Sequence, residues 1–115
     1  MVTVCYLGNF AYICPIKPKE YVDRATLAKV GDEISGISGV NLVFVIGEIS
    51  EKEVYISSRS DGSISCQLLC EKLGGGGHYT ASAVTLQNCS IEEAKNRLAE
   101  VLNLYLYDSR SRKGE

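Results

Sequence analysis

The sequence predicts an α/β fold, a single small domain in which three helices pack on a mixed β-sheet of about five strands. The chain has 115 residues, a length that is typical of one domain and sufficient for a core that folds alone. The predicted elements follow the order strand pair, helix, strand pair, helix, strand, helix, which is typical of helices packed on a sheet. No internal repeat or linker divides the chain, so we assign residues 1–115 to one domain.

The N-terminal third predicts a hairpin followed by a helix. Two β-rich runs in residues 2–16 flank Gly8-Asn9, a two-residue turn signal in which glycine supplies a positive φ. Residues 21–35 carry apolar side chains at roughly helical spacing, which predicts a helix. Gly31 weakens this helix by about 1 kcal/mol relative to alanine.

The middle of the chain predicts a second strand pair. Residues 41–49, NLVFVIGEI, form a near-continuous apolar run, as expected of a central strand that is covered on both faces. Residues 53–58 form another β-rich run. The short link between the two runs favours an antiparallel hairpin.

A short helix and a further strand are predicted next. Apolar residues follow a helical period from residue 64 to residue 73, and Gly74 stands where a helix C-terminal glycine belongs. Residues 81–86 predict a strand, whose small side chains indicate close packing.

The last element is predicted to be a long helix. Ser90 and Glu93 form a capping box at its start, because each side chain can accept a hydrogen bond from the other's backbone N–H. We expect residues 108–115, which are polar and basic, to form a flexible tail.

Composition and charge exclude several classes of protein. Hydrophobic residues make up 45% and charged residues 23% of the chain, as in globular domains and unlike disordered chains. The net charge of -2 argues against a general electrostatic grip on nucleic acid or anionic membrane, although a local basic pocket is compatible with it. No apolar run approaches the roughly 20 residues of a membrane span, and the N-terminus lacks a signal-peptide pattern. We therefore expect a cytoplasmic domain that makes no membrane contact.

The five cysteines are not expected to form a complete disulfide framework or a zinc site. An odd number cannot pair completely within one chain. With no CxxC pair and a single histidine, a structural zinc site is not expected. Cys66 and Cys70 are four residues apart and are predicted to share a buried helix face as small hydrophobic groups. Free thiols of this kind suit a reducing cytosol.

A run of four glycines, Gly74 to Gly77, followed by His78, is the first segment with candidate chemistry. Glycines let a ligand approach the backbone closely and let successive N–H groups converge on an anion. An anion-binding loop is the favoured interpretation, and a flexible connector is the alternative. No Gly-Lys-Ser/Thr follows, and the run follows a helix, so it is neither a Walker loop nor the dinucleotide fingerprint. His78 is either a phosphate donor or an ordinary loop histidine.

Arg59 is the second candidate. It closes a predicted strand just before a turn, and its guanidinium suits bidentate phosphate recognition. The alternative is an exposed surface arginine. One histidine and no paired carboxylate motif argue against nucleophilic catalysis and divalent-metal hydrolysis by this chain. We therefore predict no catalytic residue and no metal ligand in it.

These segments together resemble the DHH-associated domain, the C-terminal module that follows the Asp-His-His catalytic domain in DHH-family phosphoesterases. The matching segments are VYISSRS at residues 54–60, EKLGGGGH at residues 71–78, and the capped helix at residues 90–102. The chain looks most like the cyclic-di-AMP phosphodiesterase group, the GdpP type. The oligoribonuclease and 3'-phosphoadenosine-phosphate phosphatase group is a close relative. Alanyl-tRNA synthetase carries a related domain in which arginine usually follows the glycines, so His78 favours the phosphoesterase branch.

The resemblance implies a two-domain, manganese-dependent phosphodiesterase that hydrolyses cyclic dinucleotides such as c-di-AMP, or short oligonucleotides. The Asp-His-His domain holds the metals, and the associated domain closes over the cleft and binds substrate phosphates. Carried over, Arg59 and Ser60 would hold phosphate or base, the glycines would line the phosphate backbone, and His78 would reach the phosphate near the metals. The implied binding residues are Arg59, Ser60, Gly74, Gly75, Gly76, Gly77 and His78.

The Asp-His-His motif itself does not occur in this sequence, whose one histidine is His78. We therefore expect a fragment of a longer protein, or else a stand-alone module, and we expect the chain by itself to be inactive. Its expected partners are nucleotide or oligonucleotide phosphates, the missing catalytic domain of the same polypeptide, and a second copy in a homodimer. Relatives of the GdpP type often carry membrane helices, so the parent protein could be membrane-anchored.

Two other functions stay open at this stage. One is a non-catalytic nucleic-acid or tRNA-binding module related to the synthetase domain, which the net charge disfavours because tRNA binding favours a basic domain. The other is a stand-alone sensor of a nucleotide.

Overall fold

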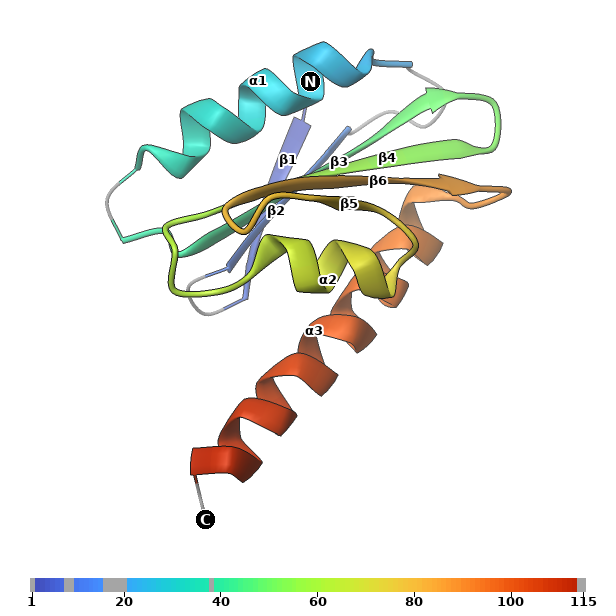
Figure 1. The fold of residues 1–115 in the computed structure, drawn as a ribbon. Coiled ribbons are helices and arrows are strands. Elements are labelled where there is room, and N and C mark those ends of the chain that lie inside the picture. Colours follow the sequence, from blue (N-terminus) through green and yellow to red (C-terminus); the bar gives the residue numbers. More distant parts are fainter. Residues whose placement is uncertain (1, 8–9, 16–20, 38, 114–115) are drawn as a thin grey trace.

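The structure is a computed structural model that describes residues 2–7, 10–15, 21–37 and 39–113. The predicted α/β domain with a mixed sheet and three helices is confirmed (Figure 1). The described elements are β1 (Val2–Leu7), β2 (Phe10–Pro15), α1 (Arg24–Ser35), β3 (Leu42–Ser50), β4 (Glu53–Ser60), α2 (Cys66–Lys72), β5 (Gly76–Gly77), β6 (Ala81–Gln87) and α3 (Ile91–Lys113).

The described strands form one sheet in the order β1-β2-β3-β4-β6-β5. Strands β2 and β3 are parallel and the other neighbours are antiparallel. Both predicted hairpins are therefore present, although the first turn, at residues 8–9, lies outside the described residues. The sheet has one strand more than the five or so expected, because Gly76 and Gly77 of the glycine run pair with β6 as β5.

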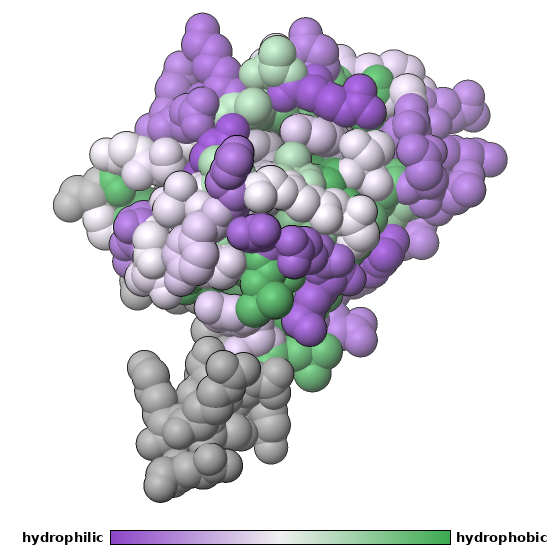
Figure 2. All heavy atoms as spheres, in the orientation of Figure 1, coloured by the Kyte–Doolittle hydropathy of each residue, from purple (hydrophilic) through white to green (hydrophobic). Residues whose placement is uncertain are grey.

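Helix α1 lies on one face of the sheet, and α2 and α3 lie on the other (Figure 1). The larger core cluster lies under α2 and α3 and includes Phe44, Ile56 and Leu98. The smaller cluster lies under α1 and contains Leu27, Val43 and Val45. Strand β3 contributes to both clusters, which confirms a central strand covered on both faces. In Figure 2, hydrophilic residues cover much of the visible face, and hydrophobic residues show in smaller areas.

Helix α1 begins at Arg24, three residues later than the predicted start at residue 21. The reason is Asp23, whose carboxylate accepts a hydrogen bond from the Thr26 N–H at 2.7 Å and caps the helix there. Hydrogen bonding from the Thr26 side chain, and then from its N–H, lowers the pKa of Asp23 from its usual range. Apolar spacing predicts the helix, but that signal carries no information about the cap.

Helix α2 is also shorter than predicted, because Ser65 caps it and the first helical residue is Cys66 rather than Ile64. The Ser65 hydroxyl accepts from the Leu68 N–H at 3.2 Å. After the helix, Gly74 has a φ of +97°, which confirms its predicted place as a C-terminal glycine.

The capping box of α3 is confirmed. The Glu93 N–H donates to Ser90 Oγ at 3.1 Å, and the Ser90 N–H donates to Glu93 Oε1 at 3.3 Å. The helix extends to Lys113 and therefore includes most of the segment 108–115. Residues 114–115 lie outside the described residues, and the flexibility of the tail stays a prediction. Among the described residues, no helix has the length and apolar character that crossing a membrane requires.

Three of the five cysteines lie within the part of the chain whose side chains are described. Cys66, Cys70 and Cys89 are buried free thiols, and the burial of Cys66 and Cys70 confirms the prediction that these two are small hydrophobic groups. Burial raises the pKa of the Cys70 thiol to about 12. At neutral pH this thiol stays protonated, so it is unsuited to act as a nucleophile.

Candidate functional site

Strands β4 and β6, with the residue that follows β5, place Arg59, Ala81 and His78 in one row across the sheet. Arg59 lies opposite Ala81 in the register of β4 and β6. On the other side, the His78 N–H donates to Ala81 O at 2.7 Å and the Ala81 N–H donates to His78 O at 3.3 Å. Directly opposed residues point to the same face of a sheet. Arg59 and His78 therefore flank Ala81 on one face, with Cα atoms about 10 Å apart across two strand spacings.

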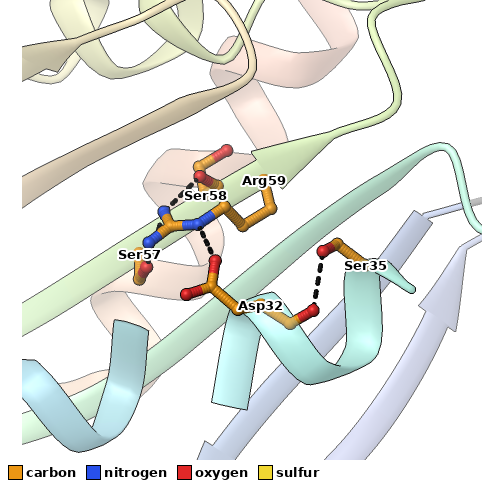
Figure 3. Close-up of polar contacts among 5 residues, drawn as sticks. All are labelled: Asp32, Ser35, Ser57, Ser58 and Arg59. Atoms are coloured by element: carbon orange, nitrogen blue, oxygen red, sulfur yellow. Dashed lines mark hydrogen bonds and ion pairs between the residues drawn. The ribbon is translucent and has the colours of Figure 1, made fainter. Parts of the chain in front are cut away.

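The shared face is the one that carries α1, as the partners of Arg59 show (Figure 3). Arg59 Nε donates to Asp32 Oδ1 of α1 at 2.7 Å. Its Nη1 donates to Ser58 O at 2.8 Å and to Ser57 Oγ at 3.2 Å. The Arg59 side chain is only 18% exposed, so it is largely buried and fixed at both Nε and Nη1. The remaining nitrogen, Nη2, makes no hydrogen bond with a described residue.

Helix α1 packs against Arg59 and Ser57 at Gly31. A Cβ built on this buried glycine would lie 3.5 Å from Arg59 Cγ and 3.6 Å from Ser57 Oγ, which is ordinary contact distance. The next helix position, Asp32, lies close enough for its carboxylate to reach the guanidinium. The glycine that weakens the helix in isolation lies where the helix packs closely on β4.

Ser60 points to the opposite face of the sheet from Arg59, because side chains alternate along a strand. Its hydroxyl donates to Ile64 O at 2.7 Å and accepts from the Gly62 N–H at 3.2 Å. The Ser60 N–H donates to Thr80 O at 3.0 Å. The structure thus brings Arg59 and His78 together and leaves the Ser60 hydroxyl in the turn that follows β4.

The glycine run divides into two parts. The Gly74 N–H donates to Glu71 O at 3.1 Å and the Gly75 N–H donates to Cys70 O at 2.8 Å, so both groups serve to end α2. Gly75 then passes directly over β6, where a Cβ would lie 2.3 Å from Ala83 O. These two glycines have structural reasons to be where they are, independent of any ligand.

The second part of the run is β5, at the edge of the described sheet. Because His78 and Ala81 exchange both hydrogen bonds, the next pair, Gly77 and Ser82, occupies a position without ladder hydrogen bonds. The Gly77 N–H therefore faces outward, away from β6. Gly77 has a φ of +144°, a conformation that side chains disfavour, and a Cβ there would lie 2.7 Å from Ser82 Cα.

The hairpin that joins β5 to β6 holds the backbone of His78 while its side chain stays exposed. His78 O accepts a second hydrogen bond, from Ser82 Oγ at 2.6 Å. At the tip, Tyr79 O accepts from the Cys66 N–H at 2.8 Å, which ties the hairpin to the start of α2. An outward backbone N–H and an exposed imidazole thus stand side by side on a fixed turn.

Asp61 fixes the neighbouring turn at the end of β4. Its carboxylate accepts from the Ser63 N–H and hydroxyl, at 3.0 and 2.6 Å, and from Asn41 Nδ2 at 2.8 Å. The hydrogen bonds from Ser63, followed by that from Asn41, lower the pKa of Asp61 from 3.8 to about 2. A lowered pKa means that ionised Asp61 supports this turn above the ordinary pKa and loses that effect as the pH falls towards 2.

Two other features lie away from this row. A cavity of about 670 Å³ lies at the opposite end of the sheet, beside the turn between β3 and β4 and the link into α3. Within the described ranges, no three His, Cys, Asp or Glu side chains are grouped so that they could hold a metal ion.

The contact of Asp32 with Arg59 cannot be predicted from the sequence. Asp32 is 27 residues from Arg59 and stands in the helix as one of several charged residues. The position of Ala81 between Arg59 and His78 cannot be predicted from the sequence either, because it depends on the register of three strands. The alternating burial of β6 shows that one of its faces is covered and the other is partly open around Ala81, Ala83 and Thr85.

Comparison with known proteins adds the family. The DHHA1 domain family matches residues 2–108. The chain is 36% identical over 104 residues to the cyclic-di-AMP phosphodiesterase GdpP of Bacillus subtilis (strain 168), which covers 90% of this chain and 16% of the relative. The chain thus spans less than a fifth of that relative.

Solved structures agree with this result. An exopolyphosphatase-related protein from Bacteroides fragilis superposes with a TM-score of 0.68 at 27% identity, over 85% of this chain and 29% of that one. The C-Ala domain of Aquifex aeolicus alanyl-tRNA synthetase superposes with a TM-score of 0.60 at 12% identity, over 90% of this chain and 94% of that one. This second likeness shows the fold alone. Because the family match covers nearly the whole chain, the chain belongs to the DHHA1 family of domains, which are associated with DHH phosphoesterases.

Proposed function

We propose that this chain is the substrate-binding domain of a DHH-family phosphodiesterase that acts on cyclic dinucleotides such as c-di-AMP, with short oligonucleotides as the related substrate class. The observation that carries the proposal is the row of Arg59, Ala81 and His78, with the outward Gly77 N–H beside it. The likeness to a cyclic-di-AMP phosphodiesterase supports the choice of substrate.

The chemistry of the row fits a phosphate. Arg59 offers a fixed positive charge and a free Nη2, and a charge-assisted hydrogen bond to a phosphate oxygen is among the stronger polar contacts. The Gly77 N–H and the His78 ring offer further donors at the other end of the row. Between them, the small side chain of Ala81 leaves room for a ligand to lie against the sheet.

Hydrolysis belongs to another domain in this proposal. The described residues do not fit a manganese site, since no metal-binding group of side chains is present among them. We assign manganese to an Asp-His-His domain of the same polypeptide. The residues of this chain bind and orient the phosphates.

A tRNA-binding function is the weaker alternative. The likeness to the C-Ala domain concerns the fold, at 12% identity. With a net charge of -2, the chain is not basic, whereas binding to a long phosphate backbone favours a basic domain.

We expect Arg59→Ala to weaken binding of both c-di-AMP and inorganic phosphate roughly ten- to a hundredfold, because a charge-assisted contact contributes about 1.5–3 kcal/mol. Both affinities are measured by titrating the 115-residue chain with each ligand and monitoring the titration by two-dimensional NMR. Arg59→Lys is expected to bind weakly as well, since an ammonium group lacks the planar fork.

Arg24→Ala is the matched control, because it removes the same charge from the same face of the sheet. Arg24 lies over the Tyr55 ring, with its guanidinium carbon 5.7 Å from the ring centroid. Tyr55 is four residues from Arg59, about 13 Å along β4. Equal affinities for the wild type and Arg59→Ala would show that Arg59 is not part of the binding site.

A further inference from the structure

The hydrogen bonds of Arg59 leave no free pair of neighbouring nitrogens. A bidentate contact with phosphate needs either Nε with Nη2 or Nη1 with Nη2. Asp32 occupies Nε, and Ser57 and Ser58 occupy Nη1. Each of these two edges of the guanidinium therefore has one nitrogen that already donates a hydrogen bond. In the ligand-free domain, a phosphate would find a single free donor, Nη2.

The partners at the two edges differ in how easily they can be replaced. Ser57 and Ser58 are buried residues of β4, and Ser58 contributes a main-chain carbonyl that the sheet holds in place. The Asp32 side chain is 65% exposed and makes a single contact with Nε. Exposed ion pairs are weak, so Asp32 can leave while the bonds at Nη1 keep the guanidinium where it is.

We propose that Asp32 is an affinity-determining residue, a carboxylate that occupies Nε of Arg59 in the free domain and gives way to a phosphate oxygen when ligand binds. This inference rests on the proposed function, since it takes Arg59 as the phosphate-binding residue. A ligand phosphate then gains the Nε and Nη2 edge, and Asp32 turns to solvent. The carboxylate therefore lowers the affinity of the site for phosphate.

To test this, the Asp32→Ala variant of the 115-residue chain is titrated with inorganic phosphate, and binding is monitored by NMR. We expect its affinity for inorganic phosphate to rise about two- to fivefold, the range that corresponds to loss of a competing exposed ion pair. Glu33→Ala is the matched control, because it removes the same charge from the next, also exposed, position of α1. At about 0.1 M salt its affinity is expected to stay within about 1.5-fold of the wild type.

Two further measurements separate competition from a change in structure. The gain is expected to vanish in the double variant Asp32→Ala/Arg59→Ala, because the competition acts through Arg59. In the wild type, the NMR signal of the Arg59 Nε–H group should shift on saturation with phosphate, as its acceptor changes from Asp32 to the ligand.

The outcomes also distinguish the two proposals. If Arg59→Ala binds phosphate as well as the wild type, the proposed function fails. If Arg59→Ala weakens binding but the affinity of Asp32→Ala for phosphate rises no more than that of Glu33→Ala, only the proposal that Asp32 competes with phosphate fails. A loss of affinity in Asp32→Ala would overturn the competition as well, and would instead make Asp32 a residue that positions Arg59.

Discussion

Gly75→Ala is expected to lower the free energy of unfolding of the domain by about 3 kcal/mol, at the upper end of the range for overpacked sites. The new Cβ would lie 2.3 Å from Ala83 O and 2.8 Å from Val84 Cα. Both atoms belong to the backbone of β6, in the middle of its pairing with β4, and cannot move aside as a flexible side chain can. We expect β5 to separate from β6 and the glycine run to lose its fixed position.

Thermal and denaturant unfolding measure this effect, and a loss of about 3 kcal/mol corresponds to a fall in Tm of roughly 10 °C for a chain of this size. Gly76→Ala is the matched control. It lies in the same run without a positive φ, and a Cβ at this position would meet no described atom beyond its chain neighbours within 4 Å. We therefore expect a change below about 0.5 kcal/mol. Equal stabilities for the two variants would contradict the packing of Gly75 on β6.

Leu27→Ala is expected to cost about 3 kcal/mol of stability, within the range for large-to-small substitutions in a core. Leu27 is 1% exposed and anchors α1 in the smaller core cluster. Its side chain lies directly over Gly47 of β3, where a Cβ would come within 2.8 Å of Leu27 Cδ2. Gly47 leaves a depression in the sheet that the Leu27 side chain fills. Alanine at position 27 would leave this depression empty.

The loss is measured by denaturant unfolding, with Lys29→Ala as the control. Lys29 is exposed on the same helix, so its truncation is expected to change stability by less than about 0.5 kcal/mol. Because α1 carries Asp32, we also expect Leu27→Ala to loosen the contact between Asp32 and Arg59, which the NMR signal of the Arg59 Nε–H group reports. An unchanged stability would show that α1 is held by other contacts.

The sequence by itself was sufficient to predict most of the secondary-structure elements and to single out candidate binding residues. The alternation of strand pairs and helices, the buried run of β3 and the capping box of Ser90 and Glu93 are all local signals. Such signals predict structure because each depends only on residues close together in the chain. The periodicity of the side chains distinguishes helix from strand, and the capping hydrogen bonds join residues three positions apart. The glycine run with His78, and Arg59, stood out for the same reason, as residue types with a specific chemistry at a short spacing.

Helix starts were the local feature that periodicity placed wrongly. Both α1 and α2 begin later than their apolar patterns suggest, at the residues after Asp23 and Ser65. In each case a capping side chain ends the non-helical segment, although apolar residues continue beyond it. Ile64, for example, packs against the core without being helical.

The tertiary structure decided which residues meet. Arg59 faces His78 across Ala81 because three strands pair in one register, and Ser60 faces away because side chains alternate along β4. Asp32 reaches Arg59 only because α1 packs on β4 at Gly31. These contacts join residues far apart in the chain, and their geometry depends on strand order, register and helix packing, which long-range burial fixes and no short stretch of sequence contains.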